Sequence, residues 1–297
     1  MSQPTLVVRF SSLGDVVLCG AVTGALAPVV FVTSQRWSTV AAALPGVQQV
    51  VALEPGESIA SLARRIPAHG RRIDLHRSLR THALSLRLGG VWDVVAGQRL
   101  RRHLRVALKI APAVPVVQRY AAAARVQPAS LPWLELSGPR DTLIVVPGAQ
   151  HTTKRWPVAH FAQAAASFPG PVLVLGGPGE ERACTTLVDA IGPRAELICG
   201  AGFDAVLPAL GRGRACLAGD TGLAHLCAAA GIPVVTVFGS THSSDGYWEQ
   251  RCHPVEAVLP CRPCARFGRA RCPFGDLRCL EDLEPGRVAE ALAEVLA

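Results

Sequence analysis

The sequence predicts an α/β protein built from two doubly wound domains of similar size. Short runs rich in Val, Leu and Ile alternate with Ala- and Leu-rich helical stretches, a pattern typical of a parallel sheet with helices on both faces. The chain has 297 residues, roughly twice the length of a typical domain. Hydrophobic residues make up 49% and charged residues 18%, which excludes a disordered chain.

The first series of elements begins near the N-terminus. The run LVVRF (6–10) is a predicted buried strand, and the turn SSLGD leads into a predicted helix over residues 15–26. The further strands predicted in this half are VVFVT (29–33), QQVVAL (48–53), RIDLHR (72–77) and VWDVVAG (91–97). Residues 98–125 are expected to be basic loop and helix.

The second series begins at TLIVVPG (142–148). Its other predicted strands are PVLVLGG (171–177), ELICG (196–200), ACLAGD (215–220) and PVVTVFG (233–239). Its predicted helices cover 158–167, 180–191, 203–210 and 221–231. The Pro-rich segment 128–139 is the natural linker, so we expect domains over 1–137 and 138–285. The final helix, 286–297, is left open to either domain, and packing back on the N-terminal domain is one of the two arrangements.

Positive charge is concentrated in the first half. Residues 1–140 hold 17 Lys and Arg against 6 Asp and Glu, whereas residues 141–297 hold 13 against 16. The net charges are therefore +11 and −3, which sum to the overall +8. Such a field attracts an anionic partner such as nucleic acid, anionic lipid or a phosphorylated glycan, and the alternative is a solvated Arg-rich face. Nucleic-acid binding predicts interleaved aromatic residues, yet 64–125 contains only Trp92 and Tyr120.

The uncharged stretch Val16–Gln35 is long enough to resemble a signal peptide or a spanning helix. Arg9 and Asp15 flank it, and Pro28 divides it into a helical piece and a β-branched piece. It is interpreted as a helix followed by a buried strand. We therefore expect a cytoplasmic protein whose ten cysteines are reduced thiols.

Asp15 is the candidate catalytic residue of the first domain. It ends the segment RFSSLGD (9–15), and it is the only carboxylate in residues 1–53. The carboxyl end of a first strand is where open α/β sheets place catalytic groups and bind anions. Ser12 and Gly14 are small enough to let a ligand approach the backbone. The alternative is that Asp15 only caps the helix.

Two strand-to-helix segments of the second domain are suited to phosphate. PGAQHTTKRWP (147–157) contains Lys154, the only lysine of that half, which is either a point charge for a phosphate or a surface lysine. In GDTGLAH (219–225), Asp220 or Thr221 is expected to cap a helix whose free amides, near Gly222, bind phosphate oxygens.

Two further residues of the second domain are weaker candidates. His225 follows Thr221 on the same helical face, either as a donor contact or packed in the core. Glu180 ends the glycine-rich turn GGPGE (176–180), where it contacts a ribose or base edge or simply begins a helix.

Several nucleotide and hydrolase motifs are absent. The sequence contains neither G-x-G-x-x-G nor G-x-x-x-x-G-K-[ST], which weakens dinucleotide and P-loop assignments. G-x-S-x-G and D-x-D are also missing, so an esterase and a metal-bound diphosphate of the D-x-D kind are unsupported.

Four cysteines near the C-terminus have an incomplete metal-site spacing. One C-x-x-C pair is followed by two more widely separated cysteines. A structural zinc is one interpretation, and reduced thiols are the other. The residues concerned are Cys261, Cys264, Cys272 and Cys279.

Three segments together resemble a known family. RFSSLGDVV, PGAQHTTKRWP and GDTGLAHLCAAAGIPVVTVFG are similar to signatures of the ADP-heptose:lipopolysaccharide heptosyltransferases of glycosyltransferase family nine. DLHRSLRT (74–81) and the C-terminal CRPC segment are also similar to family patterns. The resemblance implies a GT-B fold, in which two Rossmann-like domains face a central cleft, with the second domain holding the nucleotide sugar.

The resemblance also implies an enzyme activity. This is an inverting, metal-independent transfer of heptose from ADP-heptose to an anionic lipopolysaccharide inner-core acceptor, with Asp15 as general base. No cofactor is required for that reaction. The donor-binding residues so implied are Ser12, Gly14, Thr152, Lys154, Glu180, Asp220, Thr221, Gly222 and His225.

The N-terminal domain of such enzymes receives the acceptor, which assigns a partner to the basic half. An anionic glycolipid implies weak peripheral contact with the inner face of the cytoplasmic membrane, and no nucleic acid. The candidate acceptor-binding residues are Arg64, Arg65, Arg71, Arg72, Arg77, Arg80, Arg101, Arg102 and Arg105. The alternatives are a family member with another nucleotide sugar or surface-glycan acceptor, and a non-catalytic nucleotide- or glycan-binding relative.

Overall fold

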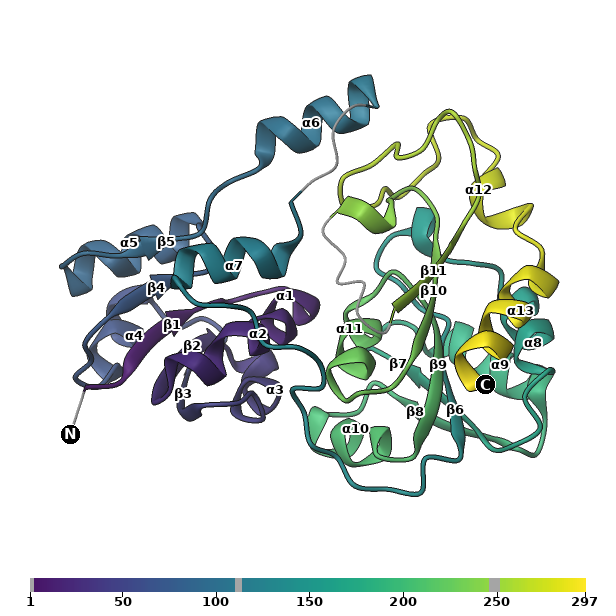
Figure 1. Cartoon of the computed structure of the whole chain (residues 1–297), viewed down its shortest axis with the longest axis horizontal. Coiled ribbons are helices and arrows are strands. Elements are labelled where there is room, and N and C mark those ends of the chain that lie inside the picture. The colour runs from purple at the N-terminus through teal and green to yellow at the C-terminus, as the bar shows by residue number, and fades with distance from the viewer. Residues whose placement is uncertain (1–2, 110–113, 246–251) are drawn as a thin grey trace. The chain divides into compact units, whose positions relative to one another are not determined.

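The structure, a computed structural model, describes residues 3–109, 114–245 and 252–297 (Figure 1). The chain divides into two compact units. The first unit contains the chain up to Gln98 together with Val114–Leu134. The second unit contains helix α6 (Arg99–Leu108) and the chain from Glu135 onward. The two doubly wound α/β folds expected from the sequence are both present.

The first unit is built on a five-stranded parallel sheet in the order β3-β2-β1-β4-β5. Its strands are β1 (Thr5–Val8), β2 (Val29–Ser34), β3 (Val47–Leu53), β4 (Arg72–Asp74) and β5 (Asp93–Val94). Its helices are α1 (Leu13–Leu18), α2 (Gly20–Thr23), α3 (Ser38–Ala42), α4 (Ile59–Arg65), α5 (Leu79–Leu88) and α7 (Val116–Ala124). Short 3-10 turns lie at Gly24–Leu26 and Gln35–Trp37. The strand β1 lies at the centre, where its apolar residues are buried on both faces.

The single helix predicted over 15–26 is instead divided into α1, α2 and a 3-10 turn. The amide of Cys19 donates to the carbonyl of Val16, only three residues back, and this ends α1. At Gly20, a Cβ atom would lie 2.8 Å from the ring of Trp133, so the glycine lets that ring pack against the backbone. The backbone remains right-handed α at both Cys19 and Gly24, so the three pieces follow one another within the predicted helical stretch.

The second unit is built on a six-stranded parallel sheet in the order β11-β10-β9-β6-β7-β8. Its strands are β6 (Thr142–Val146), β7 (Val172–Gly176), β8 (Ala195–Cys199), β9 (Gly213–Gly219), β10 (Val234–Phe238) and β11 (Cys252–Glu256). Its helices after α6 are α8 (Val158–Ala165), α9 (Glu181–Ile191), α10 (Phe203–Leu210), α11 (Gly222–Ala229), α12 (Arg278–Glu281) and α13 (Pro285–Leu296). Two 3-10 turns, η3 (Thr152–Lys154) and η4 (Ser243–Asp245), follow β6 and β10.

The edge strand β11 was not expected from the sequence. It contains Pro254, which lacks an amide donor and so argues against a strand in the middle of a sheet. At the edge only one side of the strand needs pairing, and β11 pairs in parallel with β10. This tertiary position explains why a proline is tolerated there.

Helices α13 and α6 both lie in the second unit. Val288 and Leu292 of α13 are fully buried in the core that contains Trp156 and Phe161. This packing decides the position that the sequence left open for the C-terminal helix. The expected boundary at residue 137 would have put α6 in the first domain, whereas its contacts group it with the second unit.

Membrane spanning is not a feature of the described helices. None of the helices in residues 3–109, 114–245 and 252–297 is long and apolar enough to cross a bilayer.

The central strand β1 provides a test of the first unit's stability. Leu6 is completely buried, and we expect Leu6→Ala to lower the free energy of unfolding by about 2–5 kcal/mol, because it removes apolar contacts and leaves a cavity. The matched control is Leu79→Ala, because Leu79 is 89% exposed and should change the stability by at most about 0.5 kcal/mol. Urea denaturation measures both. Equal losses in the two variants would contradict the assigned burial.

Candidate active site

Asp15 lies at the turn between β1 and α1, in the first turn of that helix. Its Oδ2 atom accepts hydrogen bonds from the amide of Ser12 at 3.1 Å and from the Ser12 hydroxyl at 2.8 Å. The guanidinium of Arg9 lies 2.6 Å from the same oxygen. Asp15 therefore does cap the turn, and it does so through Oδ2 alone.

The environment of Asp15 keeps it ionised. Burial alone raises the pKa of this carboxyl, but the positive charge of Arg9 and the hydrogen bonds from Ser12 outweigh burial, and the pKa lies below its ordinary value. The side chain is still 28% exposed. Its second oxygen, Oδ1, has a long 3.5 Å contact with the hydroxyl of Tyr120. A negatively charged oxygen is thus accessible at the end of the central strand.

Several side chains around Asp15 were not predicted from the sequence. Arg9 is fixed by a 2.6 Å bond to the carbonyl of Leu75, beyond the end of β4. Tyr120 comes from α7, far along the chain, so no local spacing indicates it. Burial, followed by the charge of Arg9, lowers the pKa of His76 to about 4, so this imidazole is neutral near pH 7.

Lys154 and Asp220 are joined in the second unit. Lys154 ends η3 after β6, and Asp220 follows β9, the neighbouring strand. The Lys154 Nζ and Asp220 Oδ2 atoms are 2.6 Å apart, and both side chains are about 15% exposed. Thr241, after β10, donates from Oγ1 to the same carboxylate at 2.8 Å. Burial raises the pKa of Asp220, but Lys154 outweighs it and the net shift is downward.

Two glycines allow these three loops to meet. A Cβ on Gly239 would lie 2.3 Å from the carbonyl oxygen of Thr153, and one on Gly219 would lie 3.0 Å from that of Lys154. The amide of Ser240 donates to the Thr153 carbonyl at 3.0 Å. The loops after β6, β9 and β10 therefore touch through their backbones, and a side chain at Gly239 would separate them.

The N-terminus of α11 lies beside the Lys154–Asp220 pair. Thr221 is the N-cap, and its hydroxyl accepts a hydrogen bond from the amide of Ala224 at 3.4 Å. Gly222 is the first residue of the helix, so its amide has no intrahelical acceptor. The charge of His225 helps to lower the pKa of Asp220, so the imidazole lies near that carboxylate. These groups favour an anion at this position.

Glu180 and Thr152 lie at the same edge of the sheet. Glu180 is the N-cap of α9, and its Oε2 atom accepts from the amide of Gly177 at 2.7 Å. Its carboxyl group lies over Gly148, where a Cβ would be 2.2 Å away. Thr152 begins η3 with an exposed side chain. Glu180 thus joins the loops after β6 and β7 as well as beginning its helix.

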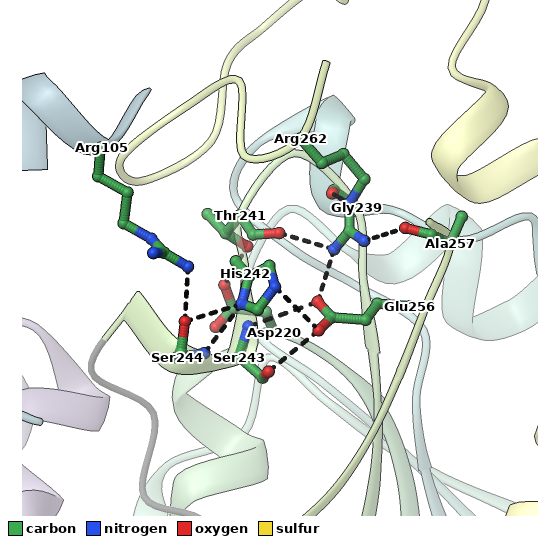
Figure 2. Close-up of polar contacts among 10 residues, drawn as sticks. All are labelled: Arg105, Asp220, Gly239, Thr241, His242, Ser243, Ser244, Glu256, Ala257 and Arg262. Atoms are coloured by element: carbon green, nitrogen blue, oxygen red, sulfur yellow. Dashed lines mark hydrogen bonds and ion pairs between the residues drawn. The ribbon is translucent and has the colours of Figure 1, made fainter. Parts of the chain in front are cut away.

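The loop after β10, Gly239–Ser244, was not predicted from the sequence as part of the site. Figure 2 shows that the buried Arg262 holds this loop. Its guanidinium donates to the carbonyls of Gly239 at 2.6 Å and Thr241 at 2.9 Å, and to Glu256 Oε2 at 2.7 Å. The other carboxylate oxygen of Glu256 accepts from Ser243 Oγ at 3.1 Å. The available signal was a polar run directly after a buried strand, as at the other sites.

The nine arginines predicted to bind the acceptor do not share one element. Arg64 and Arg65 end α4, and Arg65 is paired with Glu57. Arg71 pairs with Asp93 at 2.8 Å. The remaining unit-one members are Arg72, Arg77 and Arg80. Arg101, Arg102 and Arg105 lie on α6, in the second unit.

The four C-terminal cysteines are not grouped as a metal site in the described part of the chain. No group of three or more His, Cys, Asp or Glu side chains in that part is arranged to hold a metal ion. All ten cysteines, including Cys261, Cys264, Cys272 and Cys279, are free thiols.

The chain is similar to known proteins in both sequence and structure. The family model "Glycosyltransferase family 9 (heptosyltransferase)" matches residues 112–269. Lipopolysaccharide heptosyltransferase 1 of Pseudomonas aeruginosa is 28% identical over 170 residues, which are 52% of this chain and 48% of that protein. The chain thus matches about half the length of the curated relatives.

Two solved structures show the likeness of the fold over nearly the whole chain. ADP-heptose LPS heptosyltransferase II of E. coli has a TM-score of 0.74 at 18% identity, covering 99% of this chain and 98% of that one. E. coli heptosyltransferase WaaC with ADP has a TM-score of 0.72 at 19% identity, covering 98% and 99%.

Two Rossmann-like units of this kind define the GT-B class of glycosyltransferase folds, which confirms the predicted fold class. The family match covers more than half of the sequence. The chain belongs to glycosyltransferase family 9, the heptosyltransferase family.

The lowered pKa of Asp220 predicts a pH dependence of stability. The ionised form stabilises the fold above the ordinary pKa of 3.8, and this contribution is lost as the pH falls through the lowered folded-state pKa. Asp220→Asn cannot titrate, so its unfolding midpoint should fall less than that of the wild type between about pH 4 and pH 2. Near neutral pH the variant should be less stable, because Lys154 loses its counter-ion. Thermal denaturation across this range measures both effects.

The control for this experiment is Asp189→Asn, an exposed carboxylate on α9. Its profile should follow that of the wild type. Identical acid profiles for the wild type and Asp220→Asn would contradict the assigned ion pair.

Proposed function

We propose that the protein is an inverting, metal-independent glycosyltransferase that moves heptose from ADP-heptose to an anionic lipopolysaccharide inner-core acceptor. The observation that carries the proposal is the meeting of Lys154, Asp220 and the α11 N-terminus at one edge of the second sheet. This is an anion site in a chain of family 9. A solved relative of the same fold is described with ADP, the product expected here.

The donor diphosphate is proposed to bind at the Lys154–Asp220 pair. Asp220 holds the ammonium in place, which leaves two N–H donors of Lys154 to bind phosphate oxygens. The amides of Thr221 and Gly222 add a preorganised positive potential, which stabilises the charge that develops on departing ADP. Because these groups supply positive charge from the protein, the proposed transfer needs no metal ion.

Other residues are proposed to contact the remaining parts of the donor. Glu180 is suited to a ribose hydroxyl, because a carboxylate oxygen not bonded to Gly177 accepts hydrogen bonds. Thr152 and His225 are assigned to the phosphate side of the donor, and Ser12 and Gly14 to the sugar side. These assignments are what the family resemblance implies for residues in the segments that follow β1, β6 and β9.

Asp15 is proposed as the general base. Its Oδ2 atom is occupied by Arg9 and Ser12, so the proton of the acceptor hydroxyl passes to Oδ1 as the acceptor oxygen attacks the anomeric carbon. The bond from that carbon to the diphosphate oxygen breaks, and ADP leaves from the opposite face. One displacement of this kind inverts the configuration.

The acceptor is proposed to be a lipid-linked glycan with negative charges, recognised by exposed arginines. Arg77 and Arg80, in the segment that follows β4, belong to the same unit as Asp15. Such an acceptor places the enzyme at the inner face of the cytoplasmic membrane, as a peripheral protein. No nucleic-acid partner is proposed. The competing proposals are another nucleotide sugar, another surface glycan, or nucleotide binding without catalysis.

The identity of the donor is tested by nucleotide binding. We expect ADP to raise the unfolding temperature more than UDP or GDP, since a ligand at about one hundred times its Kd stabilises a protein by about 2.7 kcal/mol. Lys154→Met should abolish most of this shift, because it removes the charge on the diphosphate. Arg182→Met, an exposed cation on α9, is the matched control and should keep the full shift. Stabilisation by UDP or GDP alone would refute the ADP assignment.

The role of Asp15 is tested by kinetics. Asp15→Asn retains the size of the side chain but accepts no proton, so kcat should fall by about 10²–10⁴-fold. ADP affinity, measured by calorimetry, should stay unchanged because the phosphate site lies on the other unit. Asp189→Asn is again the control. Near-normal turnover in Asp15→Asn would exclude it as the base, and ADP binding without turnover in the wild type would favour a non-catalytic relative.

A further inference from the structure

Helix α6 presents its apolar side to solvent. Leu100, Leu104 and Leu108 recur every four residues and therefore lie on one face of the helix. They are 72%, 39% and 58% exposed. In a globular protein the apolar stripe of an amphipathic helix normally packs into the core. Here the usual orientation is reversed.

Polar side chains attach α6 to the second unit. Arg105 Nη2 donates to the hydroxyl of Ser244 at 2.6 Å, a contact drawn in Figure 2. Lys109, directly after the helix, donates from Nζ to the carbonyl of Pro263 at 2.6 Å. These two bonds tie α6 to the rest of the second unit, while Leu100, Leu104 and Leu108 remain exposed.

The segment 257–275 contacts α6 through Phe267. The guanidinium of Arg102 lies over the ring of Phe267, 5.2 Å from its centroid, and Arg266 lies over the same ring at 5.4 Å. Phe267 is nevertheless 57% exposed, and Phe274 in the same segment is 61% exposed. We call α6, Lys109 and this segment together the α6 surface.

The charge of the α6 surface has one sign. Residues 99–109 contain five Arg and Lys, residues 257–275 contain three Arg besides the buried Arg262, and neither stretch contains Asp or Glu. Exposed Leu and Phe side chains among Arg and Lys characterise helices that lie in a membrane interface and bind anionic lipid. A second copy of this chain would bring like charges together, which opposes association. Nucleic acid would satisfy the charge but leave the leucine stripe in water.

We propose that the α6 surface is a membrane-binding site that inserts its leucines among the headgroups of an anionic bilayer. The binding itself follows from the exposure and charge of this surface. Its use in transfer to a lipid-linked acceptor rests on the proposed function.

The α6 surface also adjoins the candidate donor site. Arg269 donates its amide hydrogen to Thr153 Oγ1 at 2.8 Å, and its carbonyl accepts from the amide of Thr153 at 3.2 Å. Thr153 is the central residue of η3, the turn that carries Lys154. Through Arg105 and Ser244, α6 also contacts the polar loop after β10. Docking of this surface would therefore hold the donor loops close to the bilayer.

Flotation of the full-length protein with lipid vesicles tests the proposal. One set consists of phosphatidylcholine alone and the other is a one-to-one mixture with phosphatidylglycerol. The wild type should bind the anionic set and not the neutral one, and added salt should release it. Replacing the stripe, with Leu100→Ser, Leu104→Ser and Leu108→Ser together, should lower partitioning at least about tenfold, since binding scales with buried apolar area.

The matched control removes exposed leucines from another helix. Leu79→Ser with Leu86→Ser acts on α5, where these residues are 89% and 72% exposed, and should leave flotation unchanged. Arg101→Glu, which keeps the whole stripe, should weaken binding several-fold and make it less sensitive to salt. Unchanged unfolding midpoints exclude misfolding as the cause of any loss.

Several results would overturn the proposal. They are a wild type that ignores anionic vesicles, a triple variant that floats like the wild type, and a control that loses as much as the triple variant. A wild-type dimer that the triple variant dissociates would assign the α6 surface to a second copy instead. The ADP-induced thermal shift is measured on the same variants, so failure of the donor proposal is seen separately from failure of membrane binding.

Discussion

The contact between Lys154 and Asp220 is the interaction on which the candidate donor site depends. It joins the end of β6 to the end of β9, and Thr241 brings in the end of β10. Two charges that are mostly buried are stable only with good geometry and with further hydrogen bonds. Gly239 and the buried Arg262 provide that geometry, because they let the loops touch and fix the third one. The ion pair and the backbone packing thus require each other.

The carboxylate of Asp15 is likewise kept ionised by a nearby cation. Its Oδ2 atom is bound tightly by Arg9, whereas its Oδ1 atom has only a long contact with the hydroxyl of Tyr120. Ion pairing to Arg9 lowers the proton affinity of the carboxylate, while the 28% exposure of the side chain leaves it accessible. The result is a carboxylate that stays deprotonated over the whole physiological pH range.

The basic residues have more than one role. In the first unit, Arg9 and Arg71 are committed to carboxylates, so they do not add freely to a positive field. Arg105 on α6 and Lys109 directly after it attach to the second unit a helix whose leucines are exposed. Net charge counts these groups alike, whereas the structure separates cations that build the fold from cations that remain available for a partner.

The sequence by itself determined the two doubly wound units, the strand-end positions of Asp15, Lys154 and Asp220, and the family. Buried parallel strands are continuous apolar runs, and the polar segments that follow them lie at one edge of each sheet, so both are local signals. Only the tertiary structure decided that Tyr120 lies at Asp15, that Arg262 holds the loop after β10, and that α6 and α13 belong to the second unit. Those contacts join residues distant in sequence, and which of them form depends on how whole elements pack.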